Sequence, residues 1–303
     1  MEESVDYSFK DDQRTRVIVN TDAKNEADDQ FAIVHAILTK SFELHGIIPA
    51  HFGKRVEHSL EASRKEVDLL LELMGLEGKI PVANGAADPI PDESTPRTSP
   101  GAQMIVDEAM KDDPRPLHVA FYGPLTDMAS AILIQPEIQD RNVCVVWIGG
   151  RDWPVGGREF NLSNDVAAAN VVFKSRIEVW QIPRPVYKKV AVSYAELVER
   201  VAPHGKLGRY LVEQLIEFNQ WVADRDGRAL EYRSLGDSPA VGVIMYPEGG
   251  NFSYHPAPEF EPTMNYLHTG RHRPIRVYDD FDQRFLLEDF FAKLAQFARG
   301  RGE

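Results

Sequence analysis

Three aspartates gather in the loop that follows the first apolar stretch of the chain. Asp22, Asp28 and Asp29 come shortly after the β-branched run 17–19 and directly before the apolar segment 31–38, whose spacing is helical. Open α/β sheets build their active sites at the carboxyl ends of their strands. Several aspartates in one loop repel one another unless a cation joins them, and oxygen ligands suit Ca²⁺ or Mg²⁺. A metal held there can activate water for hydrolysis.

Asp28 and Asp29 have a second interpretation. Acidic residues at the start of a helix cap it and interact favourably with its positive end. From this loop alone, a metal site and a simple helix cap are equally compatible with the residues.

The composition limits the partners of the protein. The chain has 303 residues, a hydrophobic fraction of 43% and a formal net charge of -13, which argues against nucleic acid or an anionic membrane as a partner. The single cysteine, Cys144, lies in an apolar run and permits no disulfide within the chain. Neither a signal peptide nor a bilayer-spanning stretch is recognisable, so we expect a cytoplasmic protein. We expect one domain over residues 1–303, with 1–15 as a flexible N-terminal arm.

Strand and helix patterns alternate along the first two-thirds of the chain. Strands are predicted at 16–20, 42–49, 80–84, 117–121, 143–148 and 177–181, and helices at 28–39, 56–74, 102–111, 124–133 and 164–174. Such alternation predicts an α/β fold with a mostly parallel central sheet and helices on both faces. From about residue 194 the pattern becomes helical, with helices at 195–201, 206–225 and 285–298. An irregular stretch is expected at 246–274 and a short strand at 275–278.

Four segments at strand ends could carry the chemistry. They are 17–29, 119–127 with its Gly-Pro-Leu-Thr-Asp turn, 149–165 with Glu159-Phe-Asn161, and 235–241 with Gly236-Asp237-Ser-Pro. Each is weak alone. Together, and in this order, they resemble the nucleoside hydrolases, the Ca²⁺-dependent N-ribosyl hydrolases that include the inosine–uridine-preferring enzymes. The resemblance implies a Rossmann-like α/β core for this chain.

The resemblance also implies a mechanism and a set of site residues. One Ca²⁺ per chain, rather than Mg²⁺, would be bound by the carboxylates of Asp22, Asp29 and Asp237 and by the backbone carbonyl of Tyr122. Ribose hydroxyls would be held by Asp28, Glu159 and Asn161. Asp22 would act as general base on a metal-bound water that attacks the anomeric carbon of a nucleoside or related riboside, giving ribose and free base, as in purine or pyrimidine salvage. Relatives are commonly dimers or tetramers, so a homo-oligomer is expected.

Some of these residues also have an ordinary structural interpretation. Glu159 and Asn161 could belong to a polar loop before a helix. Asn164 and Asp165 are expected to cap the helix that follows rather than to touch substrate.

The chain departs from the family pattern around the base and the ribose 5′ end. Gly236 stands where several members have a histidine that protonates the leaving base. The replacement donor stays open among His255, Tyr232, Trp221, His268 and His272. Lys24, Asn25 and Glu26 lie in a first loop that is two residues longer than usual. Trp153, His51 and Phe52 lie where the family often has asparagines.

Three other functions remain open. A hydrolase of a different glycoside could use the same metal centre, and a Ca²⁺-dependent sugar- or nucleoside-binding protein would need no proton donor. A phosphatase of the haloacid dehalogenase type needs a nucleophilic aspartate at the first strand end, where this chain has Asn20.

Overall fold

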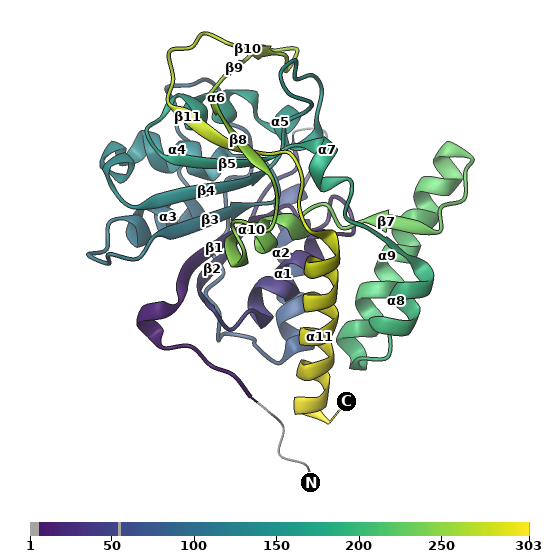
Figure 1. Cartoon of the computed structure of the whole chain (residues 1–303). Coiled ribbons are helices and arrows are strands. Elements are labelled where there is room, and N and C mark those ends of the chain that lie inside the picture. Colours follow the sequence, from purple (N-terminus) through teal and green to yellow (C-terminus); the bar gives the residue numbers. More distant parts are fainter. Residues whose placement is uncertain (1–5, 54–55, 303) are drawn as a thin grey trace.

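A seven-stranded sheet forms the centre of the protein (Figure 1). The computed structural model describes residues 6–53 and 56–302. The strand order is β2-β1-β3-β4-β5-β11-β8, and every pairing is parallel except that between β8 and β11. The strands are β1 (Thr15–Thr21), β2 (Phe42–Pro49), β3 (Leu117–Phe121), β4 (Val143–Ile148), β5 (Glu178–Ile182), β8 (Phe252–Pro256) and β11 (Pro274–Tyr278). The expected α/β fold with a mostly parallel sheet is confirmed.

Helices cover both faces of this sheet (Figure 1). One face carries α1 (Asp29–Leu38), α2 (Ser59–Met74), α10 (Ser238–Met245) and α11 (Gln283–Arg301), with α8 (Tyr194–Arg200) and α9 (Gly205–Asp226) outside them. The other face carries α3 (Pro100–Ala109), α4 (Thr126–Ile134) and α6 (Val166–Lys174). The short elements are η1 (Asp11–Gln13), η2 (Pro136–Asp140), α5 (Phe160–Asn164), α7 (Arg184–Tyr187) and the two-stranded sheets β6 (Ala191–Ser193) with β7 (Tyr232–Ser234) and β9 (Glu259–Phe260) with β10 (Tyr266–Leu267).

Strand β4, at the centre of the sheet, is apolar along its whole length because both faces of the sheet are covered. All six residues of β4 are buried. Val145 and Trp147 point into one core, and Val146 and Ile148 into the other, as the two-residue period of a strand requires. The polar residues that follow these strands are therefore left at one common edge.

Two expectations about strands were wrong. Residues 80–84 form no strand; only Val82 pairs with Ile47, as an isolated bridge beside β2. Pro81 has no N–H to donate to a neighbouring strand, which limits pairing there. The stretch 246–274, expected to be irregular, contains β8 and the β9–β10 hairpin.

Residues 1–5 of the expected N-terminal arm lie outside the described residues. No described helix is long and apolar enough to cross a membrane.

Candidate functional site

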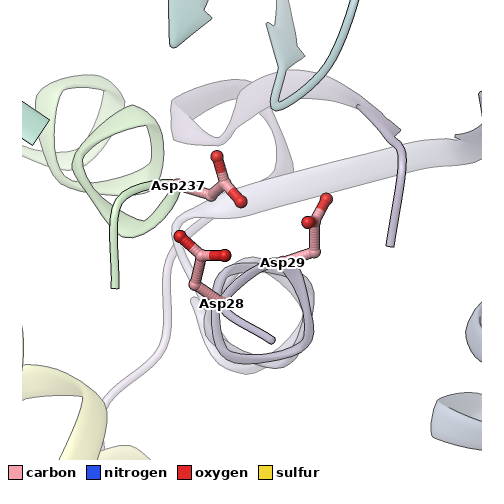
Figure 2. Close-up of side chains that lie close together, drawn as sticks. All are labelled: Asp28, Asp29 and Asp237. Carbon is pink, nitrogen blue, oxygen red and sulfur yellow. The ribbon is translucent and has the colours of Figure 1, made fainter. Parts of the chain in front are cut away.

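Three buried carboxylates meet at the sheet edge where β1 ends. Asp28 and Asp29 stand at the start of α1, and Asp237 stands at the start of α10, which packs against α1. Figure 2 shows the three side chains pointing toward one another. One oxygen of each lies within 4.8 Å of the others. Such a set of oxygen ligands can hold a hard metal ion.

Neighbouring groups fix two of these carboxylates in place. The backbone N–H of Gly236 donates a 2.8 Å hydrogen bond to Asp28 Oδ2. The hydroxyl of Thr21, the last residue of β1, donates to Asp29 Oδ1. The carboxylates are therefore positioned by the strand end and by the segment just before α10, whichever charge they carry.

Burial and mutual repulsion disfavour the charged forms of these acids. Burial, and then the charge of Asp28, raise the pKa of Asp29 to about 8. Burial also raises the pKa of Asp237, with Asp28 and Asp29 adding to the shift. Burial likewise raises the pKa of Asp22, and the charges of Asp29 and Asp28 add to the shift. Four crowded acids of this kind need either protons or a cation between them.

Asp22, in the loop after β1, lines the same cavity but does not belong to the group of acids whose oxygens lie within 4.8 Å of one another. Its side chain packs against Gly123, where an added Cβ would lie 2.9 Å from Asp22 Cγ. Asp22 Oδ2 and the Tyr122 hydroxyl are buried without a hydrogen-bond partner among the described residues. Since buried polar atoms are normally paired, these two atoms point to a bound group that supplies the missing contacts. The donor set and its unsatisfied oxygen thus fit a divalent cation.

Glu159 caps α5 and uses its acceptors within the protein. It accepts hydrogen bonds from the backbone N–H groups of Gly150 (3.0 Å), Leu162 (3.0 Å) and Asn161 (3.2 Å), and from the Tyr187 hydroxyl (2.9 Å). A carboxylate has about four lone-pair sites, so all of them are engaged. A sugar hydroxyl could reach Glu159 only by replacing one of these donors, and Tyr187 is the one side chain among them.

Asn161 braces two strand ends. Its Nδ2 donates to the carbonyl of Tyr122 (2.7 Å), which directly follows β3, and to that of Ile148 (2.8 Å), the last residue of β4. The Tyr122 carbonyl is the one expected to bind metal, and its second lone pair remains available for that role.

One cavity unites all seven residues predicted for the site. It is lined by Asp22, Asn25, Glu26, Asp28, Asp29, Tyr122, Ile148, Glu159, Phe160, Asn161, Tyr187, Lys188, Gly236 and Asp237. Tyr187 and Lys188 were missed in the sequence. They follow β5, so the rule that active sites lie after parallel strand ends could have found them.

The five suggested proton donors do not line this cavity. His255 and His268 instead border a separate recess with Trp153 and Pro154. The three others, Tyr232, Trp221 and His272, do not line the cavity of the acidic residues either. A proton donor on this cavity therefore has to be another of its lining residues.

The lengthened first loop is tied down at both ends. Lys24 pairs with the buried Glu66 of α2 at 3.0 Å. Glu26 pairs with Arg233 of β7. Between them, Asn25 and Glu26 line the cavity. Asn25 and Glu26 therefore belong to the wall of the site, whereas Lys24 anchors the loop from outside it.

Two further residues have structural roles. Asp165 accepts from the Ala168 N–H at 2.9 Å and caps α6, as expected. His51 Nε2 lies 2.9 Å from the Thr126 hydroxyl, away from the cavity lining.

Comparisons with known proteins agree on one family. Residues 17–284 match the family model described as "Inosine-uridine preferring nucleoside hydrolase". Uridine nucleosidase 1 of Arabidopsis thaliana is 24% identical over 238 residues, which are 70% of this chain and 69% of that protein. The pyrimidine-specific ribonucleoside hydrolase RihA of Salmonella typhimurium is 25% identical over 246 residues, 73% of this chain and 77% of the other.

Solved structures share the fold. A purine-preferring ribonucleoside hydrolase from Gardnerella vaginalis superposes with a TM-score of 0.77 at 19% identity, over 94% of this chain and 99% of that one. A plant nucleoside hydrolase superposes with a TM-score of 0.75 at 15% identity, over 93% and 99%.

Proposed function

This chain belongs to the inosine-uridine preferring nucleoside hydrolase family, and on that premise we propose that it hydrolyses the N-glycosidic bond of a ribonucleoside or related riboside. The products are ribose and the free base. The observation that carries the proposal is the group of buried carboxylates Asp28, Asp29 and Asp237 on a cavity at the strand ends. Polar and acidic residues dominate the lining of this cavity, as a site for a cation and a sugar requires.

The proposed cofactor is one Ca²⁺ per chain. Its ligands are the carboxylates of Asp22, Asp29 and Asp237 and the carbonyl of Tyr122, with Asp28 close enough to share the ion. An oxygen-only set with several carboxylates suits Ca²⁺ better than Mg²⁺, which prefers to keep its waters. When bound, the ion cancels the repulsion between the acids and makes a nearby water more acidic.

The general base is Asp22. Its Oδ2 has no partner within the described residues and lies on the cavity wall, so it can accept the proton of the attacking water. The water adds to the anomeric carbon while the bond to the base breaks. The surrounding carboxylates favour the positive charge that develops on the sugar.

The sugar hydroxyls are bound by Asp28, Asn161 and Glu159. Asp28 keeps one acceptor oxygen free of the Gly236 N–H and faces the cavity. Glu159 accepts a sugar hydroxyl in exchange for the hydroxyl of Tyr187. Substrate binding is thus coupled to a movement of the Tyr187 side chain.

The remaining proposals concern the whole protein. The relatives' names include both pyrimidine- and purine-preferring hydrolases, so nucleosides of either class are candidate substrates in base salvage. We propose that residues 1–303 act as one domain, because the cavity draws on residues from Asp22 to Asp237. We also propose assembly into a homodimer or homotetramer, because relatives in the family are commonly dimers or tetramers.

The decisive experiment measures free ribose released from uridine, cytidine, inosine and guanosine, with added Ca²⁺ and with a chelator. Ribose release that the chelator stops and Ca²⁺ restores supports the proposal. If calorimetry detects Ca²⁺ binding but no nucleoside yields ribose, the hydrolase proposal is wrong. A Ca²⁺-dependent binding protein or a hydrolase of another glycoside then replaces it, and binding of unhydrolysed nucleosides separates these two.

A further inference from the structure

Lys188 alone carries a positive charge among the described residues that line the cavity. Six of the other lining residues are carboxylic acids: Asp22, Glu26, Asp28, Asp29, Glu159 and Asp237. No histidine is among the lining residues. A departing base leaves with an electron pair and needs a proton or a positive charge beside it, and carboxylates cannot provide that charge.

Backbone contacts hold Lys188 beside Gly236. The Ser234 hydroxyl donates to the Lys188 carbonyl at 2.8 Å. The Leu235 N–H donates to the Val190 carbonyl at 2.7 Å. Residues 188–190 therefore run alongside residues 234–236, and the latter segment leads directly into Asp237. Lys188 is thus fixed next to the metal-ligand segment without belonging to it.

Gly236 itself leaves little space for a side chain. An added Cβ would lie 3.0 Å from Tyr187 Cδ2 and 3.1 Å from Asp28 Oδ2. Tyr187, the residue before Lys188, thus occupies the space over Gly236. A proton donor at this end of the cavity has to come from a neighbouring segment.

The ammonium group of Lys188 is available for a ligand. The side chain is exposed, and within residues 6–53 and 56–302 its Nζ makes neither an ion pair nor a hydrogen bond. The next residue differs: Lys189 Nζ lies 3.5 Å from Asp280 Oδ1 and does not line the cavity. Lys188 Nζ stacks instead over the Tyr187 ring, 5.7 Å from its centre.

Three other donor groups on the cavity are committed or inaccessible. The Tyr187 hydroxyl donates to Glu159. The Tyr122 hydroxyl is buried and belongs to a residue that is 1% exposed. Asn161 Nδ2 donates to two carbonyls. Lys188 remains as the one charged donor that can turn toward a bound base.

We propose that Lys188 is a catalytic residue that donates to the leaving base. This inference rests on the proposed riboside hydrolysis. As the C–N bond breaks, its electron pair passes to the base nitrogen, and the Lys188 ammonium gives up a proton to the base. Water supplies the hydroxyl that joins the anomeric carbon, and its proton goes to Asp22. Asp22 then releases its proton to solvent and Lys188 takes one up from solvent, so the net reaction consumes only water.

The test compares substrates whose leaving groups differ in their need for a proton. Uridine and inosine need one, whereas 4-nitrophenyl β-D-ribofuranoside releases a stable anion without it. Lys188→Met is expected to lower kcat on the two nucleosides by about 10²- to 10⁴-fold, the usual contribution of a general acid. Its kcat on the nitrophenyl riboside should change by less than about threefold. Lys188→Arg, which keeps the charge but does not give up its proton, should recover little of the nucleoside activity.

Lys189→Met is the matched control. It removes the neighbouring ammonium and should leave all three substrates unaffected. Equal loss on all three substrates in Lys188→Met, or no loss on any, overturns the role of Lys188. A wild-type protein that hydrolyses neither the nucleosides nor the nitrophenyl riboside overturns the proposed function instead, so the two failures are distinguishable.

Discussion

The backbone N–H of Gly236 donates a 2.8 Å hydrogen bond to Asp28 Oδ2, which joins the segment before α10 to the loop before α1. Gly236 can approach so closely because it has no side chain. The same contact places Asp237, the next residue, against Asp28 and Asp29. The acidic cluster therefore depends on a glycine that carries no chemistry of its own.

A methyl group at position 236 should disturb this contact. In Gly236→Ala the new Cβ would lie 3.0 Å from Tyr187 and 3.1 Å from Asp28, and overpacking of this kind costs about 1–3 kcal/mol. Urea unfolding measures the loss. Gly300→Ala, at a helix position with nothing within 4 Å, is the control and should not be destabilised. Equal stability of the two variants would contradict the close approach.

Asp237→Asn should change stability in opposite directions with and without metal. Removing one of the crowded charges relieves repulsion, so the Tm of the metal-free protein should rise. The loss of a carboxylate ligand should weaken Ca²⁺ binding by roughly 10- to 100-fold or more. Calorimetry and thermal melts measure both effects. Asp226→Asn, which removes an exposed acid paired with Arg225, should change neither. Undiminished Ca²⁺ affinity in Asp237→Asn would remove Asp237 from the metal site.

The metal-free protein should lose stability as the pH rises. The pKa of Asp29 is raised from 3.8 to about 8 in the folded protein, so the folded state holds this proton more tightly than the unfolded state. In chelator, the free energy of unfolding should fall between about pH 4 and pH 8, by up to about 1.4 kcal/mol per pH unit for each proton involved. The decrease should be smaller in Asp29→Asn. Saturating Ca²⁺ should oppose it, because the ion binds the deprotonated acids.

Asp22→Asn should separate catalysis from binding. The amide keeps the size of the carboxylate but cannot accept the proton of water, so kcat should fall by about 10²- to 10⁴-fold. Nucleoside binding, measured by calorimetry with Ca²⁺ present, should weaken far less. Near-normal turnover in Asp22→Asn would show that another group is the base.

The sequence predicted the fold and the location of the site for one common reason. Apolar strands that alternate with helices form a parallel sheet, and the polar residues after such strands meet at one edge. Asp22, Tyr122, Glu159 and Asp237, far apart in the chain, therefore line one cavity. Their chemical roles in the reaction remain predictions.

Contacts between loops could not be predicted in this way. The saturation of Glu159 depends on Tyr187, which arrives from α7, and no periodicity relates these two residues. The place of Lys188 depends on the pairing of residues 188–190 with 234–236. Strand β8 was missed because the flanking Pro and Gly residues suggested irregular chain, whereas its antiparallel pairing with β11 decides its structure.

The lengthened first loop should depend on Glu66 for its position. This α2 residue is 3% exposed and accepts hydrogen bonds from Gln30 and Tyr210 while it pairs with Lys24. Glu66→Ala would leave buried donors without a partner and should cost about 1–3 kcal/mol. Lys24→Met removes only the half-exposed end of the network and should cost less than about 1 kcal/mol. Because Asn25 and Glu26 line the cavity, Glu66→Ala should also raise KM for the substrate more than it lowers kcat. Urea unfolding and steady-state kinetics measure the two effects, and an unchanged KM in a destabilised Glu66→Ala would show that the loop does not shape the substrate site.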